Sequence, residues 1–330
     1  MRVAVKWPER TATGEMLVVN GDVTLRVVVA GEGPVVLFVP GWPELASSWR
    51  LQMVHFAQRG YRVAALDVRG YGGSSAPLAV ERYTLRELAA DVAAVAAALD
   101  DDPIVLVGHD WGAPIAWTTA IRYPDRVRAV AGLSVPHTPP TPLSLIDLFD
   151  QLYAGRFFYM LYFQEPYVAE MAFEADLRAA LKRVYFGFSG LAPVNSLLSS
   201  GSRDDTLLSL LPEPPDGPLA FISDAELDEI VATFERTGLT GAFNRYRALT
   251  LDVETSSDIL GAMVHQPSCF IAGELDPVRA LIPGNDLFAN AGASCTDFRG
   301  TTLINGAGHW VQQEAPAAVN DALEYFLESL

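Results

Sequence analysis

The chain has few cysteines, a deficit of positive charge and no long apolar run. Its two cysteines, Cys269 and Cys295, form neither a disulfide framework nor a metal-binding motif, which fits a reducing compartment. Among 330 residues, 40 are acidic and only 23 are basic, so the formal charge is −17. This charge disfavours binding to nucleic acid or to an anionic membrane surface, and we expect neither as a partner.

The first twenty residues lack the long apolar core of a signal peptide. The Ala-rich stretch from Leu88 to Leu99 is too short to span a bilayer and is interrupted by Asp91. Half of the residues are hydrophobic and 19% are charged, which is typical of a globular protein. We therefore expect a cytoplasmic protein that is long enough for one large core or two packed domains.

Apolar runs and helical patterns alternate along the first part of the chain. Strands are predicted at residues 23–30, 34–40, 61–66, 103–107 and 126–135. A helix is predicted from Thr84, where Thr84 and Glu87 have the spacing of a capping box, and another over 111–122. Such alternation predicts an α/β protein with a mostly parallel central sheet and helices on both faces.

The alternation breaks at the Pro-rich stretch "PHTPPTPLS" and returns only at "PSCFIAGELD", "TTLINGAGHW" and a last helix to Leu330. Between about 143 and 247 the patterns are helical, with no clear strand. We predict a core of residues 1–137 and 248–330, interrupted by a helical cap of residues 138–247. A cap in this place would cover the strand ends at which open α/β sheets bind ligands.

The stretch "GHDWG", residues 108–112, joins a predicted strand to a predicted helix and has the pattern of a nucleophile elbow with Asp110 in place of serine. Asp276 and His309 follow in the order nucleophile, acid, histidine, with Glu274 as the nearest rival acid. A carboxylate that attacks a saturated carbon gives an ester, which water can cleave, whereas serine would give a stable ether. His309, oriented by Asp276, would then activate that water.

Two backbone N–H groups, of Trp111 and of Trp42 in "VPGWPE", are the predicted oxyanion donors, since proline has no N–H to offer.

A carboxylate nucleophile serves two substrate classes, haloalkanes and epoxides. A halide leaves as a stable anion, whereas an epoxide needs an acid for its oxygen, and the tyrosines Tyr159 and Tyr246 are the candidates. A binding protein on the same scaffold would tolerate loss of the nucleophile or of His309, and a serine esterase would need a serine elbow.

The stretches "GWPE", "DVRGYGGSS", "GHDWGAPIAW", "FFYMLYFQEP", "GAFNRYR" and "GAGHWVQQEAP" extend over most of the chain. With them the chain resembles the soluble epoxide hydrolases of the α/β-hydrolase fold. "GHDWG" is shared with haloalkane dehalogenases, the alternative function, whereas "YMLYFQEP" and "FNRYR" are specific. The resemblance implies that Asp110 is the nucleophile, that Asp276 and His309 are the charge pair, and that Tyr159 and Tyr246 polarise the epoxide. We expect no cofactor and no metal.

Aromatic residues near these positions are expected to wall the pocket for a small apolar epoxide. They are Phe158, Tyr162 and Trp310. Tyr162 lies three positions after Tyr159, on the same face of a helix, and competes with it as the acid. Only the resemblance favours Tyr159.

Two positions depart from the family pattern. Pro40 stands where the family usually has histidine, and Arg245 stands where it often has tryptophan. The resemblance also implies a cis peptide bond between Trp42 and Pro43. His109 is expected to point to the side of the turn opposite the nucleophile. The sequence leaves open whether the chain forms a homodimer.

Overall fold

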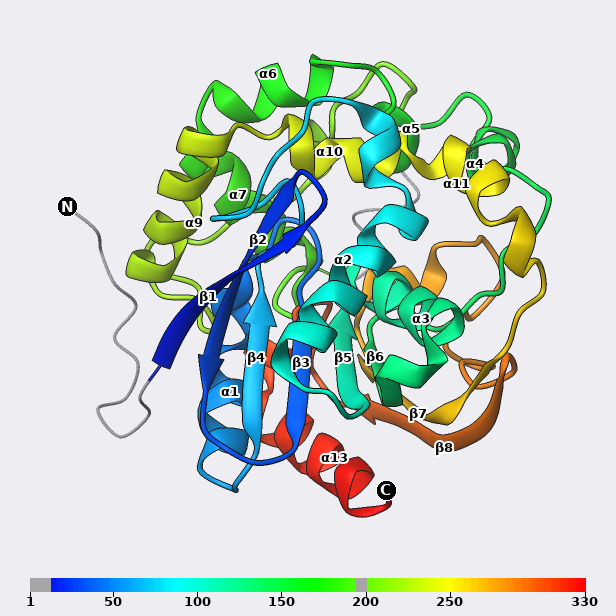
Figure 1. Ribbon diagram of the computed structural model, residues 1–330. Coiled ribbons are helices and arrows are strands. Elements are labelled where there is room, and N and C mark those ends of the chain that lie inside the picture. Colours follow the sequence, from blue (N-terminus) through cyan, green and yellow to red (C-terminus); the bar gives the residue numbers. More distant parts are fainter. Residues whose placement is uncertain (1–12, 194–200) are drawn as a thin grey trace.

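A single eight-stranded sheet forms the centre of the molecule. The computed structural model describes residues 13–193 and 201–330 (Figure 1). The strand order is β1-β2-β4-β3-β5-β6-β7-β8; β2 is antiparallel to both of its neighbours, and the strands from β4 to β8 are parallel. The strands are β1 Thr13–Asn20, β2 Val23–Ala30, β3 Val35–Val39, β4 Arg62–Leu66, β5 Ile104–His109, β6 Val127–Leu133, β7 Val264–Gly273 and β8 Cys295–Ile304.

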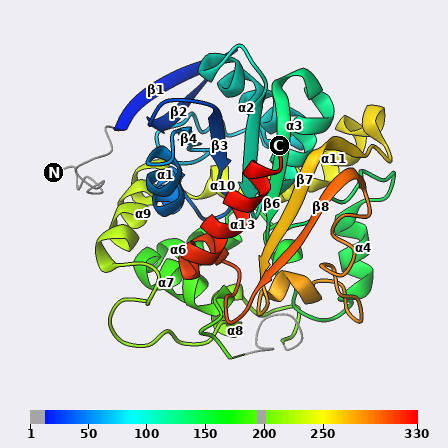
Figure 2. The same cartoon turned by 90° about the horizontal axis from the view of Figure 1, so that it is seen from below.

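Helices cover both faces of this sheet, as Figure 2 shows. Helices α2 (Leu85–Leu99) and α3 (Gly112–Arg122) pack on one face, and α1 (Arg50–Ala57) and α13 (Pro316–Glu328) pack on the other. Successive side chains of a strand point to opposite faces. In β3, Leu37 and Val39 therefore join the core under α2 and α3, whereas Val36 and Phe38 join the core under α1 and α13.

The predicted strands and the α/β-hydrolase arrangement are confirmed, but the first strand was not predicted. β1 forms a hairpin with β2 in which Asn20 pairs with Val23. The turn between them contains Gly21 with a φ of 62°, a left-handed conformation that glycine adopts without steric cost. The two loop residues are Gly21 and Asp22, and Gly-Asp between two apolar runs is a hairpin signal that could have revealed β1.

The capping box predicted at the start of α2 is only half formed. The Thr84 side chain accepts a hydrogen bond from the Glu87 N–H at 3.4 Å. The Glu87 carboxylate does not return this bond to Thr84, because it pairs with the guanidinium of Arg69 at 3.0 Å. A charged partner attracts a carboxylate more strongly than a backbone N–H does, so the prediction was wrong in this half.

A helical insert lies between β6 and β7 and covers the carboxyl ends of the parallel strands (Figure 1). Within the described residues between these strands, only isolated bridges interrupt the helices and loops. Helical structure continues past residue 247, because α11 runs to Thr255. The bounds of a cap at 138 and 247 stay a prediction. The helices are α4 Leu145–Leu152, α5 Tyr159–Tyr162, α6 Val168–Glu174, α7 Leu177–Phe188, α8 Leu207–Leu210, α9 Asp224–Thr237, α10 Thr240–Arg247 and α11 Leu249–Thr255.

Both cysteines, Cys269 and Cys295, are buried and free. In the part of the chain that the structure describes, no cluster of three or more His, Cys, Asp or Glu side chains is placed to hold a metal ion. Over the same residues, no helix is both long enough and apolar enough to cross a membrane.

Candidate active site

Asp110 lies at the tip of a sharp turn between β5 and α3. Its φ of 50° is positive, which costs energy for a residue with a side chain and is typical of a nucleophile elbow. The flanking glycines make the turn possible. A Cβ on Gly108 would lie 2.1 Å from the Gly112 carbonyl oxygen, and one on Gly112 would lie 2.0 Å from the Val39 carbonyl oxygen. The spacing of the two glycines in the motif therefore follows from this close backbone approach.

The two carboxylate oxygens of Asp110 have different partners. Oδ1 accepts a hydrogen bond from the Trp42 N–H at 2.7 Å, and Oδ2 lies 3.3 Å from Nε2 of His309. The Trp111 N–H lies at the N-terminus of α3, where no helical carbonyl accepts it. Burial raises the pKa of Asp110, but the hydrogen bond and charge of His309 outweigh burial and lower this pKa below its usual value. The side chain is therefore a carboxylate at neutral pH.

His309 completes a chain of hydrogen bonds from Asp110 to Asp276. Its Nδ1 lies 3.1 Å from each carboxylate oxygen of Asp276, and both side chains are buried. Glu274, the rival acid, is exposed. Burial lowers the pKa of His309, but the charges of Asp276 and Asp110 outweigh it, so the pKa is raised well above its usual value. In this state the imidazole is an imidazolium between two carboxylates.

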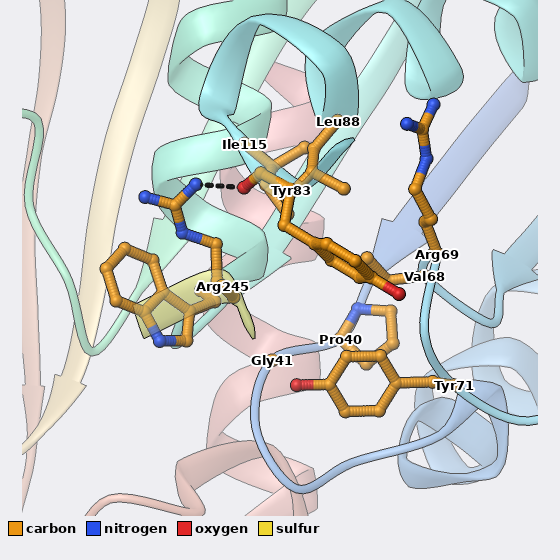
Figure 3. Close-up of a pocket in the computed structure, with 10 residues that line it drawn as sticks. Pro40, Gly41, Val68, Arg69, Tyr71, Tyr83, Leu88, Ile115 and Arg245 are labelled. Atoms are coloured by element: carbon orange, nitrogen blue, oxygen red, sulfur yellow. Dashed lines mark hydrogen bonds between the residues drawn. The ribbon is translucent and has the colours of Figure 1, made fainter. Parts of the chain in front are cut away.

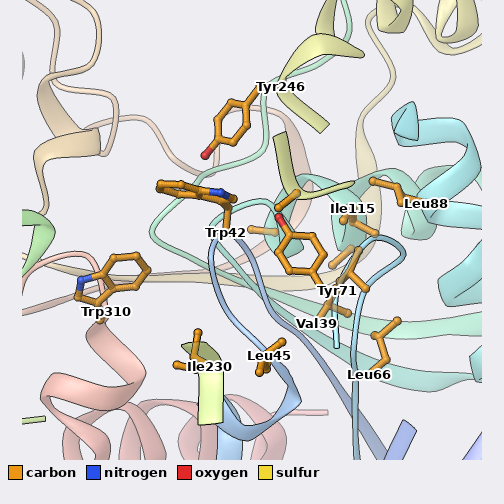
Figure 4. Packing of buried hydrophobic residues seen from close by; sticks show 14 of the residues in the cluster. Val39, Trp42, Leu45, Leu66, Tyr71, Leu88, Ile115, Ile230, Tyr246 and Trp310 are labelled. Carbon is orange, nitrogen blue, oxygen red and sulfur yellow. The ribbon is translucent and has the colours of Figure 1, made fainter. Parts of the chain in front are cut away.

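Two buried tyrosines face this group from the helical insert. Tyr159 begins α5 and Tyr246 lies in α10, and their ring centroids are 6.0 Å apart. The Tyr246 ring packs edge-on against Trp42, its centroid 5.9 Å away (Figure 4). Burial, and then the charge of Asp110, raise the pKa of both tyrosines well above the usual value, although a hydrogen bond with Trp111 lowers that of Tyr246. Both hydroxyls therefore keep their protons at neutral pH.

These side chains meet in one cavity. Its walls are mostly aromatic, and its charged groups belong to the Asp110–His309 pair. The cavity brings together most of the predicted side chains and adds two that were not predicted, Phe188 and Val278. The lining residues are Trp42, Asp110, Tyr159, Phe188, Tyr246, Val278, His309 and Trp310.

Comparison with known proteins gives a consistent result. The family described as alpha/beta hydrolase fold matches residues 34–316. Epoxide hydrolase A of Mycobacterium tuberculosis is 41% identical, over 97% of this chain and 98% of its own. Two solved structures, epoxide hydrolase A from Mycobacterium thermoresistibile and an epoxide hydrolase from an endophytic Streptomyces, are 38% and 37% identical with TM-scores of 0.86 and 0.89. They cover 96% and 97% of this chain and 98% and 96% of theirs.

The chain belongs to the epoxide hydrolase family. Among the aromatic residues predicted for the pocket of this epoxide hydrolase, only Trp310 lines the cavity. Phe158 precedes α5 with an extended backbone, and its ring stacks on Tyr153 at a centroid distance of 4.2 Å. The Tyr162 ring lies 5.7 Å from that of Phe157, and its buried hydroxyl has no hydrogen-bond partner. Helical spacing predicted that Tyr159 and Tyr162 share one face, but in the structure Tyr159 lines the cavity and Tyr162 does not.

A buried polar network beneath His309 was missed by sequence reasoning. The His309 carbonyl oxygen lies 2.7 Å from Nε2 of His109 and accepts a hydrogen bond from the Ser134 hydroxyl at 3.0 Å. The other ring nitrogen of His109 lies 2.6 Å from the buried carboxylate of Glu44. His109 thus points away from the substrate side of the turn, as predicted, but it contacts the backbone of the active-site histidine. These partners are 65 to 200 residues apart in the sequence, so no local pattern signals them.

The two departures from the family pattern line the same second cavity. Pro40 and Arg245 are both among its lining residues (Figure 3). The Arg245 guanidinium stacks over the Trp111 ring at 4.7 Å and bonds to the Tyr83 carbonyl oxygen and to Asp252. Arg245 therefore fills the space behind the elbow and does not wall the cavity that holds Asp110.

The loop that carries the predicted oxyanion donor has the expected backbone. The peptide bond between Trp42 and Pro43 is cis, as the resemblance predicted. Without a histidine at position 40, the loop is held by Glu44, whose carboxylate accepts the Gly41 N–H at 3.2 Å. The same carboxylate accepts the side-chain amides of Gln312 and Gln313 at 2.8 and 3.0 Å.

Proposed function

We propose that the chain hydrolyses a small apolar epoxide to a vicinal diol through a covalent ester on Asp110. One observation carries this proposal. A carboxylate paired with His309 shares an aromatic cavity with the protonated hydroxyls of Tyr159 and Tyr246. A nucleophile, an acid and a base then lie around one apolar space, as epoxide opening requires. The aromatic walls favour an apolar substrate.

In the first step, Oδ2 of Asp110 attacks an epoxide carbon. The bond from that carbon to the epoxide oxygen breaks, and the oxygen takes a proton from Tyr159 or Tyr246. An alkoxide is too basic to leave unaided, so an acid in contact with the oxygen accelerates the step by roughly 10²–10⁴-fold. Asp110 needs no base, because its lowered pKa keeps it ionised.

Formation of the ester prepares His309 for the second step. In the free enzyme, Asp110 and Asp276 together raise the pKa of His309. The ester of Asp110 carries no charge, so alkylation removes one of these two influences and the pKa of His309 falls. The imidazolium then gives its proton to the tyrosinate, and the neutral imidazole is ready to act as a base.

In the second step, His309 takes a proton from water while Asp276 holds the ring in place. The hydroxide attacks the ester carbonyl carbon, and the negative charge develops on Oδ1, where the N–H groups of Trp42 and Trp111 would stabilise it. The bond from the carbonyl carbon to Oδ2 breaks, and His309 returns its proton to the departing oxygen. The diol leaves, and the Asp110 carboxyl, which now holds the oxygen atom of the water, gives its proton to His309 and restores the starting pair of carboxylate and imidazolium.

The alternative, a haloalkane dehalogenase, would use the same Asp110 and His309. The observation against it is the pair of tyrosine hydroxyls at the cavity, since a halide leaves without an acid. The names of the relatives also favour an epoxide. The helical insert supplies both tyrosines, and we propose residues 138–247 as the cap of this enzyme.

An isotope experiment tests the ester. After a single turnover of styrene oxide in ¹⁸O water, we expect label in the peptide that contains Asp110 and little label in the diol. The His309→Gln variant should open one epoxide and then retain the substrate mass on that peptide. If instead His309 directs water straight onto the epoxide, the first diol formed carries the label, and no adduct is trapped.

A further inference from the structure

A carboxylate outside the proposed reaction lies where the helical insert meets the His309 loop. Glu314 ends the short helix α12 (Val311–Glu314), and its Oε2 accepts the N–H groups of Gly190 at 2.8 Å and of Gly308 at 3.0 Å. Its Oε1 accepts the Trp310 N–H at 3.0 Å. Gly308 and Trp310 are the two neighbours of His309, and Gly190 belongs to the segment that follows α7 in the insert. One side chain therefore joins both sides of the junction.

The backbones at this junction are in direct contact. The His309 N–H donates a hydrogen bond to the Phe188 carbonyl oxygen at 2.9 Å. A Cβ on Gly190 would lie 2.3 Å from the Gly306 carbonyl oxygen, and one on Gly308 would lie 2.2 Å from the Gly190 nitrogen. The insert therefore forms part of the surroundings that fix the His309 backbone.

We propose that Glu314 is a positioning residue for His309, acting through the backbone N–H groups on either side of it and tying them to the insert. The proposal rests on the proposed function, in which His309 acts as a base only after the ester has formed. A glutamine in this place offers one oxygen to three donors and turns its own N–H groups toward at least one of them. Such a mismatch removes a charge-assisted hydrogen bond and loosens the loop.

The expected kinetic effect is confined to one half of the reaction. A displacement of about 1 Å at a catalytic group can cost roughly 10²-fold in rate. In Glu314→Gln we expect hydrolysis of the ester to slow by about 10–100-fold. Attack by Asp110 relies on its own charge and on the tyrosines, so we expect this step to change much less. The ester should then accumulate in the steady state.

The test measures the two steps separately. Rapid-quench mass spectrometry of the intact protein with styrene oxide gives the rate of ester formation, the rate of its decay and its steady-state fraction. Gly190→Ala is the second variant, because it keeps the carboxylate but forces the insert away from Gly306; we expect the same accumulation. Near-UV circular dichroism and the Tm show that each variant is folded.

Glu226→Gln is the matched control. Glu226 pairs with Arg50 and so also ties the insert to the core, but it does so at α9. Arg50 also bonds to the Gln313 side chain in α12, and this contact does not involve Glu226. Glutamine can keep the capping box that Glu226 forms with Ser223. We expect wild-type ester levels in this variant.

Three results would overturn the inference. They are an equal slowing of both steps in the folded Glu314 or Gly190 variants, wild-type ester levels in both, or the same accumulation in the Glu226 variant. If no adduct forms in the wild-type protein or in His309→Gln, the proposed ester itself is wrong and this inference falls with it. An adduct in His309→Gln without accumulation in the Glu314 and Gly190 variants overturns the positioning role alone.

Discussion

Tyr159 and Tyr162 provide a matched pair for testing the acid in the proposed reaction. They begin and end the same helical turn, α5, and each can lose only its hydroxyl by substitution with phenylalanine. Tyr159 lines the cavity with Asp110, whereas Tyr162 does not. The Tyr162 hydroxyl is buried without a hydrogen-bond partner, so it supplies the same chemical change at a place outside that cavity.

The magnitude follows from what each hydroxyl contacts. A positioned general acid contributes roughly 10²–10⁴-fold, which corresponds to about 2.7–5.4 kcal/mol of transition-state stabilisation. Tyr159 and Tyr246 share this contribution, so each single variant should lose about 10²-fold in ester formation, and the double variant more. Tyr162→Phe removes an unpaired buried hydroxyl, so the free energy of unfolding should stay the same or rise by about 1 kcal/mol.

The assay is the rate of ester formation with styrene oxide under single-turnover conditions. It isolates the step in which the acid acts and excludes product release.

The reasoning would be refuted if Tyr162→Phe slowed ester formation while Tyr159→Phe had no effect. The acid would then act from outside the cavity that holds the nucleophile. A loss of less than threefold in the double Tyr159 and Tyr246 variant would show that ring opening needs neither hydroxyl.

Two further predictions concern buried charges. The raised pKa of His309 stabilises the fold below its unfolded pKa of about 6.5, and this stability is lost as the pH rises through the folded pKa. In Asp110→Asn, where only Asp276 still raises the pKa, the fall of the Tm with rising pH should be smaller and should end at lower pH than in the wild-type protein; identical Tm profiles would contradict the assignment. Arg245→Met leaves Asp252 without its cation and should lower the free energy of unfolding by about 3 kcal/mol in urea titrations. An undiminished single variant would show that this ion pair contributes nothing.

Local signals were sufficient to predict that Asp110, His309 and Asp276 come together in one site. Asp110 lies between two glycines whose spacing is dictated by backbone contact, and His309 follows a strand in a motif of its own. The strands were equally readable, because a buried strand is a continuous apolar run. The strand missed, β1, has both faces less deeply buried, and its only strong signal is the Gly21–Asp22 turn.

What the sequence could not supply is the set of contacts between distant segments. Phe188 joins the cavity because the end of α7 packs against the loop that carries His309, more than a hundred residues later. Tyr162 was a rival of Tyr159 on helical spacing alone, and only the packing of Phe157 and its neighbours separates them. The Glu87 carboxylate pairs with Arg69 and not with the Thr84 N–H, because a cation from another segment competes with a local backbone N–H.

The hydrogen bond from Trp42 to Oδ1 gives the two oxygen atoms of Asp110 different lifetimes on the enzyme. Oδ1 is held at the site where negative charge collects during hydrolysis, whereas Oδ2, beside His309, is the atom that reaches the substrate. In the proposed reaction every product molecule carries away the current Oδ2, and a water molecule replaces it. Oδ1 does not leave with the product. If the carboxylate does not rotate between turnovers, the original Oδ1 atom of the synthesised protein stays in place, whereas Oδ2 is replaced with each diol released.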